Sequence, residues 1–410
     1  MESARIVAGL ARLVGDVGRA EDFAQDALLA ALERWSESGV PDNPGAWLAA
    51  VARRRAIDQL RRRSMAERKH RELAVELAQA GTFEAPDAEP GEAIEDEVLR
   101  LIFICCHPVL STEARVALTL RLVGGLTTEE IARAFLVPVS TLAQRVVRAK
   151  RTLREARVPF QLPPEAELPE RLASVLEVVY LVFNEGYAAT SGEDWIRPEL
   201  CRDALRLGRI LAELAPAEPE AHGLVALMEL HASRLAARIG PEGEAVLLMD
   251  QDRSRWDRLH IGRGLDALRR SQVLGGGLRE ALGPYTLQAA IAACHARAVT
   301  PEETDWVAIA ALYDALAQLV PSPVVELNRA VAISRAFGPT EGLELVDGLV
   351  AEGALDGYHL LRAVRGDLLE QLGRQDEARA EFTRAAEMAG NERERALLRQ
   401  RAGERGPGRV

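Results

Sequence analysis

Apolar side chains recur at three- and four-residue steps along most of this chain, the spacing that gives a helix one buried face. Near the N-terminus Ile6, Leu10, Leu13 and Val17 follow this spacing. Aromatic residues make up only 4% of the sequence while alanine, leucine, arginine and glutamate dominate, a mixture that favours helix over strand. No apolar run is long enough to cross a bilayer. The sequence therefore predicts an all-α protein.

Turn and linker residues divide the expected helices into several domains. Prolines, glycines and polar residues break the helical spacing at 36–45, 64–93 and 158–164. A chain of 410 residues is also too long for one ordinary core. We expect six segments: a helical module at 1–65, an acidic flexible linker at 66–93, a second helical module at 94–158, a proline-rich linker at 159–169, a helical extension at 170–295, and helical repeats at 296–400.

Charge is distributed unevenly along the chain. The net charge is −11, but residues 1–158 hold 23 basic and 23 acidic side chains, so residues 159–410 carry all of it. Basic residues concentrate in two short stretches, nine of them in 53–71 and six in 145–157. Two basic helices on an otherwise acidic protein form a local electrostatic footprint for a nucleic acid.

Residues 125–150 carry the most specific local pattern, GLTTEEIARAFLVPVSTLAQRVVRAK. Thr127, with Glu130 three residues later, predicts a capping box at the start of a short helix. A turn at 136–138 follows, and Ser140 or Thr141 is expected to cap a second helix. This layout is that of a helix-turn-helix, whose second helix enters the major groove of DNA.

The second of these helices is expected to carry the DNA contacts. Leu142, Val146 and Ala149 form its predicted inward face. Six polar side chains are expected on the outer face: Gln144, Arg145 and Arg148 to read base edges, and Lys150, Arg151 and Arg154 to neutralise phosphates. The alternative for this segment is a helical hairpin with a solvated basic face.

A second basic segment, residues 44–63, combines one apolar side with six arginines. Alone it is a generic nucleic-acid surface or a solvated helix face. Together with 125–154 and with AEDFAQDAL at 20–28, it resembles the two conserved modules of a sigma factor of the extracytoplasmic-function (ECF) type, in the sigma-70 superfamily. The resemblance extends almost continuously over residues 5–157.

This resemblance implies partners and contact residues. The implied partners are core RNA polymerase, through its β′ clamp and β flap, and promoter DNA. Residues 20–28 correspond to the clamp-binding helix, 44–63 to the helix that melts promoters and reads the minus-10 element, and 125–154 to the minus-35 reader. The 36–45 loop would hold a flipped-out base. The implied polymerase-binding residues are Asp22, Gln25 and Asp26. The implied DNA-binding residues are Arg54, Asp58, Arg61, Arg62, Thr141, Gln144, Arg145, Arg148, Lys150 and Arg151.

Three further phrases are similar to a subgroup of these factors that has a long C-terminal tetratricopeptide-like extension: LIFICCHP at 101–108, LRLVGGLT at 120–127 and VFNEGY at 182–187. In that subgroup the extension is needed for activity, no dedicated anti-sigma factor is known, and genes for small YCII-like proteins lie nearby. The resemblance therefore implies control by the extension and a YCII-like partner.

Three features depart from the family pattern. Ala143 stands where relatives often have lysine or arginine, so base reading is expected to depend more on Gln144, Arg145 and Arg148. Arg54 replaces a common asparagine, which bears on the minus-10 preference. The chain also begins later than is usual, which predicts either an upstream start codon or a short first clamp-binding helix.

The C-terminal region contains one segment with the spacing of a tetratricopeptide repeat, in which small residues lie where paired helices cross. Its members are Gly366, Gly373, Ala378, Phe382 and Ala385. Residues 306–313 have the spacing of the opening helix of another repeat. The alternative is an irregular helical domain.

Several polar residues suggest sites of other kinds. Adjacent Cys105 and Cys106 do not readily share one tetrahedral ion, so we expect them to pack in a core and His107 to end their helix. Three further histidines lack metal-ligand spacing: His222, His231 and His260. Residues 184–187 either line a ligand pocket or end a helix with Gly186 in the left-handed conformation. Trp35 and Trp47 are expected in a core rather than stacked on melted bases.

Two functions fit the sequence. The first is a cytoplasmic transcription initiation factor that has no cofactor and no chemistry of its own. The second is a ligand- or protein-responsive helix-turn-helix regulator that does not bind polymerase. The 20–63 segment discriminates between them, because a simple regulator has no need for it. An enzyme is the least supported class, since the sequence has no nucleophile elbow, phosphate loop or metal cluster.

Overall fold

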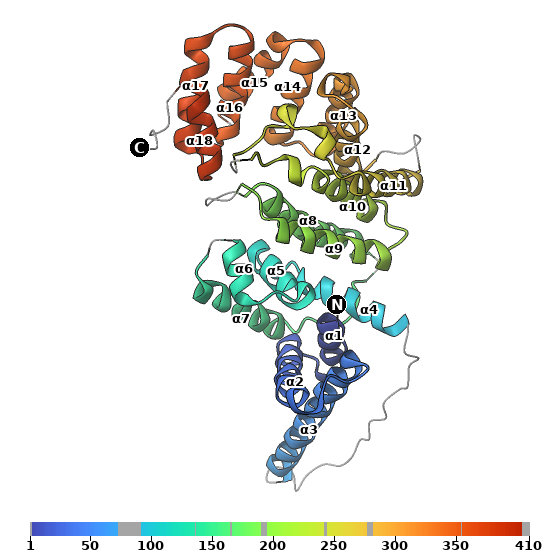
Figure 1. The fold of residues 1–410 in the computed structure, drawn as a ribbon. Coiled ribbons are helices and arrows are strands. Elements are labelled where there is room, and N and C mark those ends of the chain that lie inside the picture. The colour runs from blue at the N-terminus through green and yellow to red at the C-terminus, as the bar shows by residue number, and fades with distance from the viewer. Residues whose placement is uncertain are drawn as a thin grey trace. The chain divides into compact units, whose positions relative to one another are not determined.

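The computed structural model describes residues 2–72, 92–135, 137–164, 166–189, 195–241, 244–276, 282–353 and 355–403. The chain forms two compact units, Met1–Val178 and Val179–Val410 (Figure 1). Both are helical, and the described residues include isolated β-bridges, one of them between Ile239 and Ala245, but no strand. The predicted all-α fold is confirmed. Among the described helices, none is both long and apolar enough to span a membrane.

In the part of the chain that the structure describes, the first unit contains seven α-helices, one π-helical turn and the first half of an eighth α-helix. They are α1 (Glu2–Val14), α2 (Val17–Ser38), α3 (Pro44–Glu72), α4 (Glu92–Cys105), α5 (Thr112–Thr119), η1 (Leu120–Gly124), α6 (Thr128–Ala134), α7 (Val139–Glu155) and the first half of α8 (Leu168–Tyr187). The side chain of Asp16 caps α2 by accepting from the Arg19 N–H at 3.1 Å, and Ser111 caps α5. Helix α3 continues past its expected end near Arg63 to Glu72.

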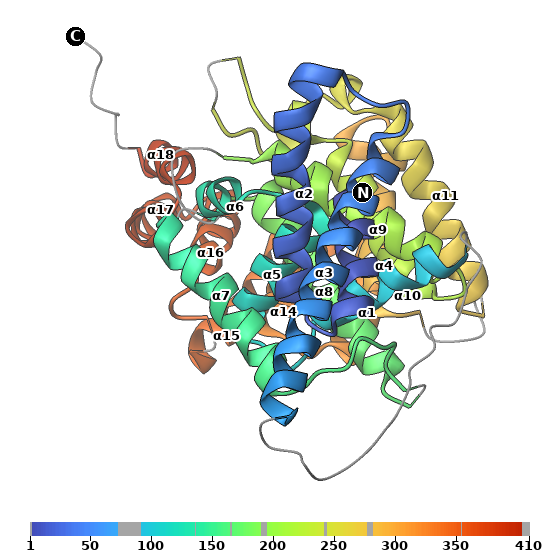
Figure 2. The same ribbon diagram turned by 90° about the horizontal axis from the view of Figure 1, so that it is seen from below.

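Small buried residues bring the first three helices close together. Ala8 and Ala11 on α1, Ala20 on α2, and Ala52 and Ala56 on α3 have no exposed surface. Helices α1, α2 and α3 all contact one another, and they lie side by side in both views (Figures 1 and 2). This packing leaves the polar sides of α2 and α3 facing outward.

The second unit begins with the second half of α8 and continues as a series of helix pairs. The elements are α9 (Pro198–Leu214), α10 (Pro219–Ala232), η2 (Leu235–Ala237), η3 (Leu248–Asp250), η4 (Arg253–Arg255), α11 (Arg258–Leu274), α12 (Pro284–Arg297), η6 (Pro301–Glu303), α13 (Trp306–Leu319), α14 (Pro323–Phe337), α15 (Pro339–Glu352), α16 (His359–Gln371), α17 (Gln375–Met388) and α18 (Glu392–Arg401). Proline opens five of these helices, where its missing N–H costs no helical hydrogen bond.

The last helix pair contains the contact that the repeat spacing predicted. Gly366 on α16 lies against the ring of Phe382 on α17, so closely that a Cβ on Gly366 would stand 2.8 Å from Phe382 Cε1. Gly373 adopts a left-handed conformation, with a φ of 76°, in the turn between the two helices. Ala378, Phe382 and Ala385 are buried in the core that these helices share.

The structure corrects the expectation that Gly186 ends a helix in the left-handed conformation. Gly186 lies inside α8 and is absent from the residues with positive φ. Its role is to let α9 approach, because a Cβ there would stand 2.7 Å from the Cys201 nitrogen and 2.9 Å from the Arg197 carbonyl oxygen. Glu185 and Arg197 form an ion pair across the same junction.

Gly186→Ala is therefore expected to lower the free energy of unfolding of the second unit by about 1–3 kcal/mol, the usual cost of overpacking a core. Gly262→Ala is the matched control, because Gly262 lies in α11 with open space around its Cα. We expect that control to raise stability by about 0.5–1 kcal/mol, the difference in helix propensity between the two residues. Urea unfolding followed by circular dichroism measures both changes. Equal effects of the two substitutions would contradict the close approach of α9.

Candidate nucleic-acid interface

Helices α6 and α7 form the helix-turn-helix that the sequence predicted. The Glu130 N–H donates to the Thr127 hydroxyl at 3.1 Å, and the Thr127 N–H donates to the Glu130 carboxylate at 2.7 Å. This reciprocal pair is the predicted capping box. Just before it, Gly125 turns the chain with a φ of 76°. The start of the first helix is thus fixed by local hydrogen bonds.

The inward face of α7 agrees with the prediction, but its N-cap does not. Leu142, Val146 and Ala149 are buried. Helix α7 begins at Val139, with Pro138 in the capping position, and neither Ser140 nor Thr141 caps it through a side chain. The helix thus starts two residues earlier than a cap at Ser140 would place it, and three earlier than a cap at Thr141. Pro138 has the fixed φ of proline, −58°, with an extended ψ of 138°, a conformation that suits the N-cap position.

The residues expected to read base edges converge on one surface of α7. Thr141, Gln144 and Arg148 are exposed, and Arg145 is half-buried. All four line a hollow of about 420 Å³ between α7 and the start of α5. The guanidinium of Arg151 lies further along, 3.6 Å from Glu155 in an exposed pair. This surface has the donors that recognition of bases and phosphates needs.

Lys150, in the C-terminal half of α7, is instead engaged within the first unit. Lys150 forms an ion pair with Glu21 of α2, and Arg121 of η1 donates to the same carboxylate at 2.7 Å. Glu21 is only 6% exposed, so this three-residue cluster is largely withdrawn from water. The Lys150 ammonium is therefore not available to a phosphate in this arrangement.

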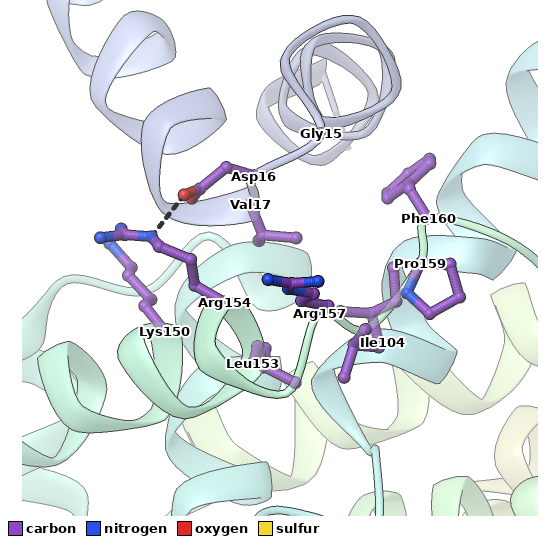
Figure 3. A pocket seen from close by; sticks show the side chains of 11 residues that line it. Gly15, Asp16, Val17, Ile104, Lys150, Leu153, Arg154, Arg157, Pro159 and Phe160 are labelled. Atoms are coloured by element: carbon purple, nitrogen blue, oxygen red, sulfur yellow. Dashed lines mark hydrogen bonds and ion pairs between the residues drawn. The ribbon is translucent and has the colours of Figure 1, made fainter.

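A cavity of about 300 Å³ lies at this junction, between the α1–α2 turn and the end of α7 (Figure 3). The Arg154 Nε stands 2.6 Å from the Asp16 carboxylate across it, and Lys150 points to the same side (Figure 3). Burial alone would raise the pKa of Asp16, but the hydrogen bonds from the Arg19 N–H and from Arg154 outweigh it and hold the pKa below its usual value.

The expected polymerase- and DNA-contacting residues of the first module lie on exposed helix faces. Those of α2 and α3 with described side chains are Asp22, Gln25, Asp26, Arg54, Asp58 and Arg61, and all six are exposed. The Arg62 side chain lies outside the described residues.

A hydrogen bond joins α2 and α3: Arg55 donates to the Asp26 carbonyl oxygen. The loop between α2 and α3 begins at Gly39 and is closed by Asn43, whose side chain accepts from the Ala46 N–H at 3.0 Å.

The tryptophans and the adjacent cysteines have packing roles in the structure. The rings of Trp35 and Trp47 lie 5.4 Å apart and tilted, half-buried between α2 and α3. Cys105 and Cys106 have no exposed surface, and burial raises the pKa of Cys106 to about 11. Helix α4 ends at Cys105, two residues before His107. Over the described ranges, no three His, Cys, Asp or Glu side chains are grouped as metal ligands.

A helix-turn-helix with an exposed polar recognition helix, together with the basic helix α3 in the same compact unit, places the chain in the class of DNA-binding transcription proteins. Comparison with known families agrees. The family model for sigma-70 region 2 matches residues 2–65, and that for sigma-70 region 4 matches 100–153. Residues 171–272 match a family of unknown function, DUF6596.

Three known proteins are similar to this chain. The uncharacterized protein R00370 of Rhizobium meliloti is 43% identical over 390 residues, which cover 95% of this chain and 90% of that protein. The probable ECF RNA polymerase sigma factor SigI of Mycobacterium tuberculosis is 28% identical over 154 residues, covering 37% of this chain and 52% of the relative. SigK of Mycobacterium ulcerans, an ECF RNA polymerase sigma factor, is 29% identical over 154 residues, 37% of this chain and 78% of the relative. The chain belongs to the sigma-70 family of RNA polymerase sigma factors, and within it to the ECF type.

Reasoning from the sequence missed Glu21 and Asp16 as partners of α7. Both precede the expected clamp-binding residues on α2, and Glu21 lies on the apolar side of that helix beside Ala20, Phe23 and Ala24. An acidic residue at an inward-facing helical position is the signal that predicts a buried ion pair.

Proposed function

We propose that this sigma factor binds core RNA polymerase through its β′ clamp and β flap and directs initiation at promoters. In this proposal Asp22, Gln25 and Asp26 contact the clamp, the basic face of α3 contacts minus-10 DNA, and the outer face of α7 reads the minus-35 element. The observation that carries it is the exposed polar surface of α7 on a capped helix-turn-helix, in a chain that also has the separate basic helix α3. We propose no enzymatic step, and the place of action is the cytoplasm, where polymerase meets promoter DNA.

In vitro transcription with purified core polymerase tests this function directly. We expect the chain to co-purify with the core enzyme and to direct initiation at discrete start sites. Promoter binding by the chain without polymerase association would favour the alternative, a helix-turn-helix regulator that acts alone.

Arg148→Ala is expected to weaken binding to the minus-35 element by about 1–3 kcal/mol and to relax base preference at one position, because an exposed guanidinium at this place in α7 suits a base edge. Arg151→Ala is the matched control, since that side chain is expected to contact a phosphate. This substitution should weaken binding to all sequences alike. It should also lower the slope of the logarithm of the binding constant against the logarithm of the salt concentration by about one. Fluorescence anisotropy with consensus and mutated duplexes, measured over a salt series, separates the two results. Equal losses on both duplexes for Arg148→Ala would exclude base reading by this residue.

We further propose that the C-terminal extension controls activity and that a small YCII-like protein is a partner of the extension. The resemblance of 182–187 and its neighbouring phrases to extended factors of this type supports both ideas. Affinity capture with the full chain as bait tests for the partner.

The pairing of α2 with α7 supports a second feature of the mechanism. While Lys150 and Arg121 share the Glu21 carboxylate, α7 has fewer charges to offer DNA. We propose that region 4 is released from region 2 when the chain docks on polymerase, where the two modules engage separated promoter elements.

A further inference from the structure

Two arginines of the second unit are packed against aromatic rings near the end of α10. The guanidinium of Arg238 lies 3.9 Å from the centre of the Tyr187 ring and 5.4 Å from that of Trp195. The guanidinium of Arg234 lies 5.7 Å from the centres of both Tyr187 and Trp256. These five residues are here called the Arg234–Arg238 site. Both of its cations lie near the same ring, that of Tyr187.

The two cations have no acidic partner among the residues that the structure describes. Arg234 is only 7% exposed, and it lies near a second cation, Arg238. Burial, and secondly the charge of Arg238, hold the pKa of Arg234 below its usual value. Other arginines of this unit are paired with carboxylates. Arg209 donates to Glu229, and Arg365 donates to Asp347 and Glu381.

Arg253 is the informative comparison, because it approaches the same Trp256 ring at 5.0 Å. Its guanidinium donates to the carbonyl oxygens of His295 and Ala298, at 3.0 and 2.8 Å, and to the Thr304 hydroxyl at 2.9 Å. Among the described residues, three acceptors bind the terminal nitrogens of Arg253, although its Nε has no partner, whereas no acceptor binds the guanidinium of Arg234 or of Arg238. Aromatic faces offset part of the cost of a buried cation, but not the full cost of an unpaired one.

The unsatisfied atoms at the site are all hydrogen-bond donors. They are the Nε atoms of Arg234 and Arg238 and the indole Nε1 atoms of Trp195 and Trp256, each buried without a hydrogen-bond partner in the part of the chain that the structure describes. Buried polar groups in folded proteins are nearly always satisfied, so four orphaned donors around two cations call for an acceptor that carries negative charge. His231, which contacts Tyr187, adds no charge, since burial first and the two arginines second hold its pKa well below the usual value.

We propose that the Arg234–Arg238 site binds the oxyanion group, carboxylate or phosphate, of a small molecule. Guanidinium groups suit this role because their planar N–H donors match an oxyanion in pairs. The depth of Arg234 favours a small ligand over the acidic surface of a folded protein, while the half-buried Arg238 and Trp195 mark the side from which the ligand enters. The site lies in the extension, and its occupancy does not depend on polymerase or promoter binding.

Binding is tested on the full chain with inorganic phosphate and with succinate, each against sodium chloride of equal ionic strength. We expect at least one anion to raise the unfolding temperature of the second unit in a saturable manner, by about 3 °C at ten times its dissociation constant. A response to phosphate alone identifies a phosphate-bearing ligand, and a response to succinate alone identifies a carboxylate. Isothermal titration of the unmodified protein gives an independent measure of the same binding.

Substitutions at the site separate specific binding from a general salt effect. Arg234→Met and Arg238→Met are expected to abolish the response, and Arg238→Lys, which keeps the charge but loses the planar donor pair, to weaken it about tenfold. Arg269→Met is the matched control, because that side chain is 72% exposed on α11 in a pair with Asp266. Without ligand, Arg234→Met should unfold at no lower temperature than the unmodified chain, since it removes an unpaired buried charge. Absence of saturable binding of both anions, binding retained by both methionine variants, or binding of an acidic peptide alone would overturn the proposal.

Discussion

Replacing Glu21 with alanine is expected to raise the affinity of the free chain for minus-35 DNA about tenfold. Glu21 is the buried carboxylate that Arg121 and Lys150 share, and its removal leaves two partly buried cations without their counter-charge. Removal of one partner of a buried ion pair costs about 3–5 kcal/mol of folding free energy. The more exposed Arg154–Asp16 pair is expected to contribute far less to the packing of α2 on α7. The packing of α2 on α7 should therefore loosen, and Lys150 should become available to a phosphate.

Two measurements together identify this effect. Anisotropy with a minus-35 duplex over a salt series should show a steeper salt dependence for Glu21→Ala, by about one additional neutralised phosphate. Hydrogen exchange in α7 should become faster, because the helix loses its contact with α2. Glu33→Ala is the matched control, since Glu33 is an exposed carboxylate on the same helix and changes the net charge equally. If both variants bind DNA alike, the proposed release of region 4 is wrong.

The local features of the helix-turn-helix could be predicted because nearby residues determine them. The Thr127–Glu130 capping box depends on four consecutive residues, and the inward face of α7 depends on the helical period alone. The expected cap at Ser140 or Thr141 failed for an equally local reason. Pro138, with its fixed φ and extended ψ, already occupies the N-cap, which leaves Ser140 and Thr141 inside the first turn of α7.

The role of Gly186 could not be predicted from the sequence. A glycine followed by an aromatic residue near the end of a helical run is typical of a left-handed C-cap, and nothing in 184–187 contradicts that interpretation. The decisive fact is the approach of Arg197 and Cys201 from the next helix. Such a contact depends on the angle at which two helices pack, which no spacing within one helix determines.

Glu21 and the Arg234–Arg238 site were missed for the same reason. The partners of Glu21 lie about a hundred or more positions away in the sequence, on η1 and α7. Arg234 looks like an ordinary arginine after a helix until the fold surrounds it with Tyr187 and Trp256. Burial of a charge is a property of the tertiary structure, whereas the sequence records only that the charge is present.

Removing the second unit is expected to lower promoter-dependent transcription at least tenfold, rather than to raise it. Masking of basic helices by the acidic extension would predict the opposite result. Yet the two charges at the end of α7, Lys150 and Arg154, are already paired with Glu21 and Asp16 of the first unit. These two charges therefore need no acid from residues 179–410, and the resemblance to factors whose extension is needed for activity favours an activating role over a masking role.

Two truncations distinguish loss of this role from damage to the first unit. A chain ending at residue 165 also loses the start of α8, where Arg171 donates to the Phe103 carbonyl at 2.9 Å and Ser174 to the Cys106 carbonyl at 3.1 Å. A chain ending at Tyr187 keeps these contacts. We expect the chain that ends at Tyr187 to bind core polymerase, as measured by co-purification, and still to initiate poorly in vitro. Transcription above that of the full chain would establish masking instead, and unchanged transcription would show that the extension is dispensable for initiation.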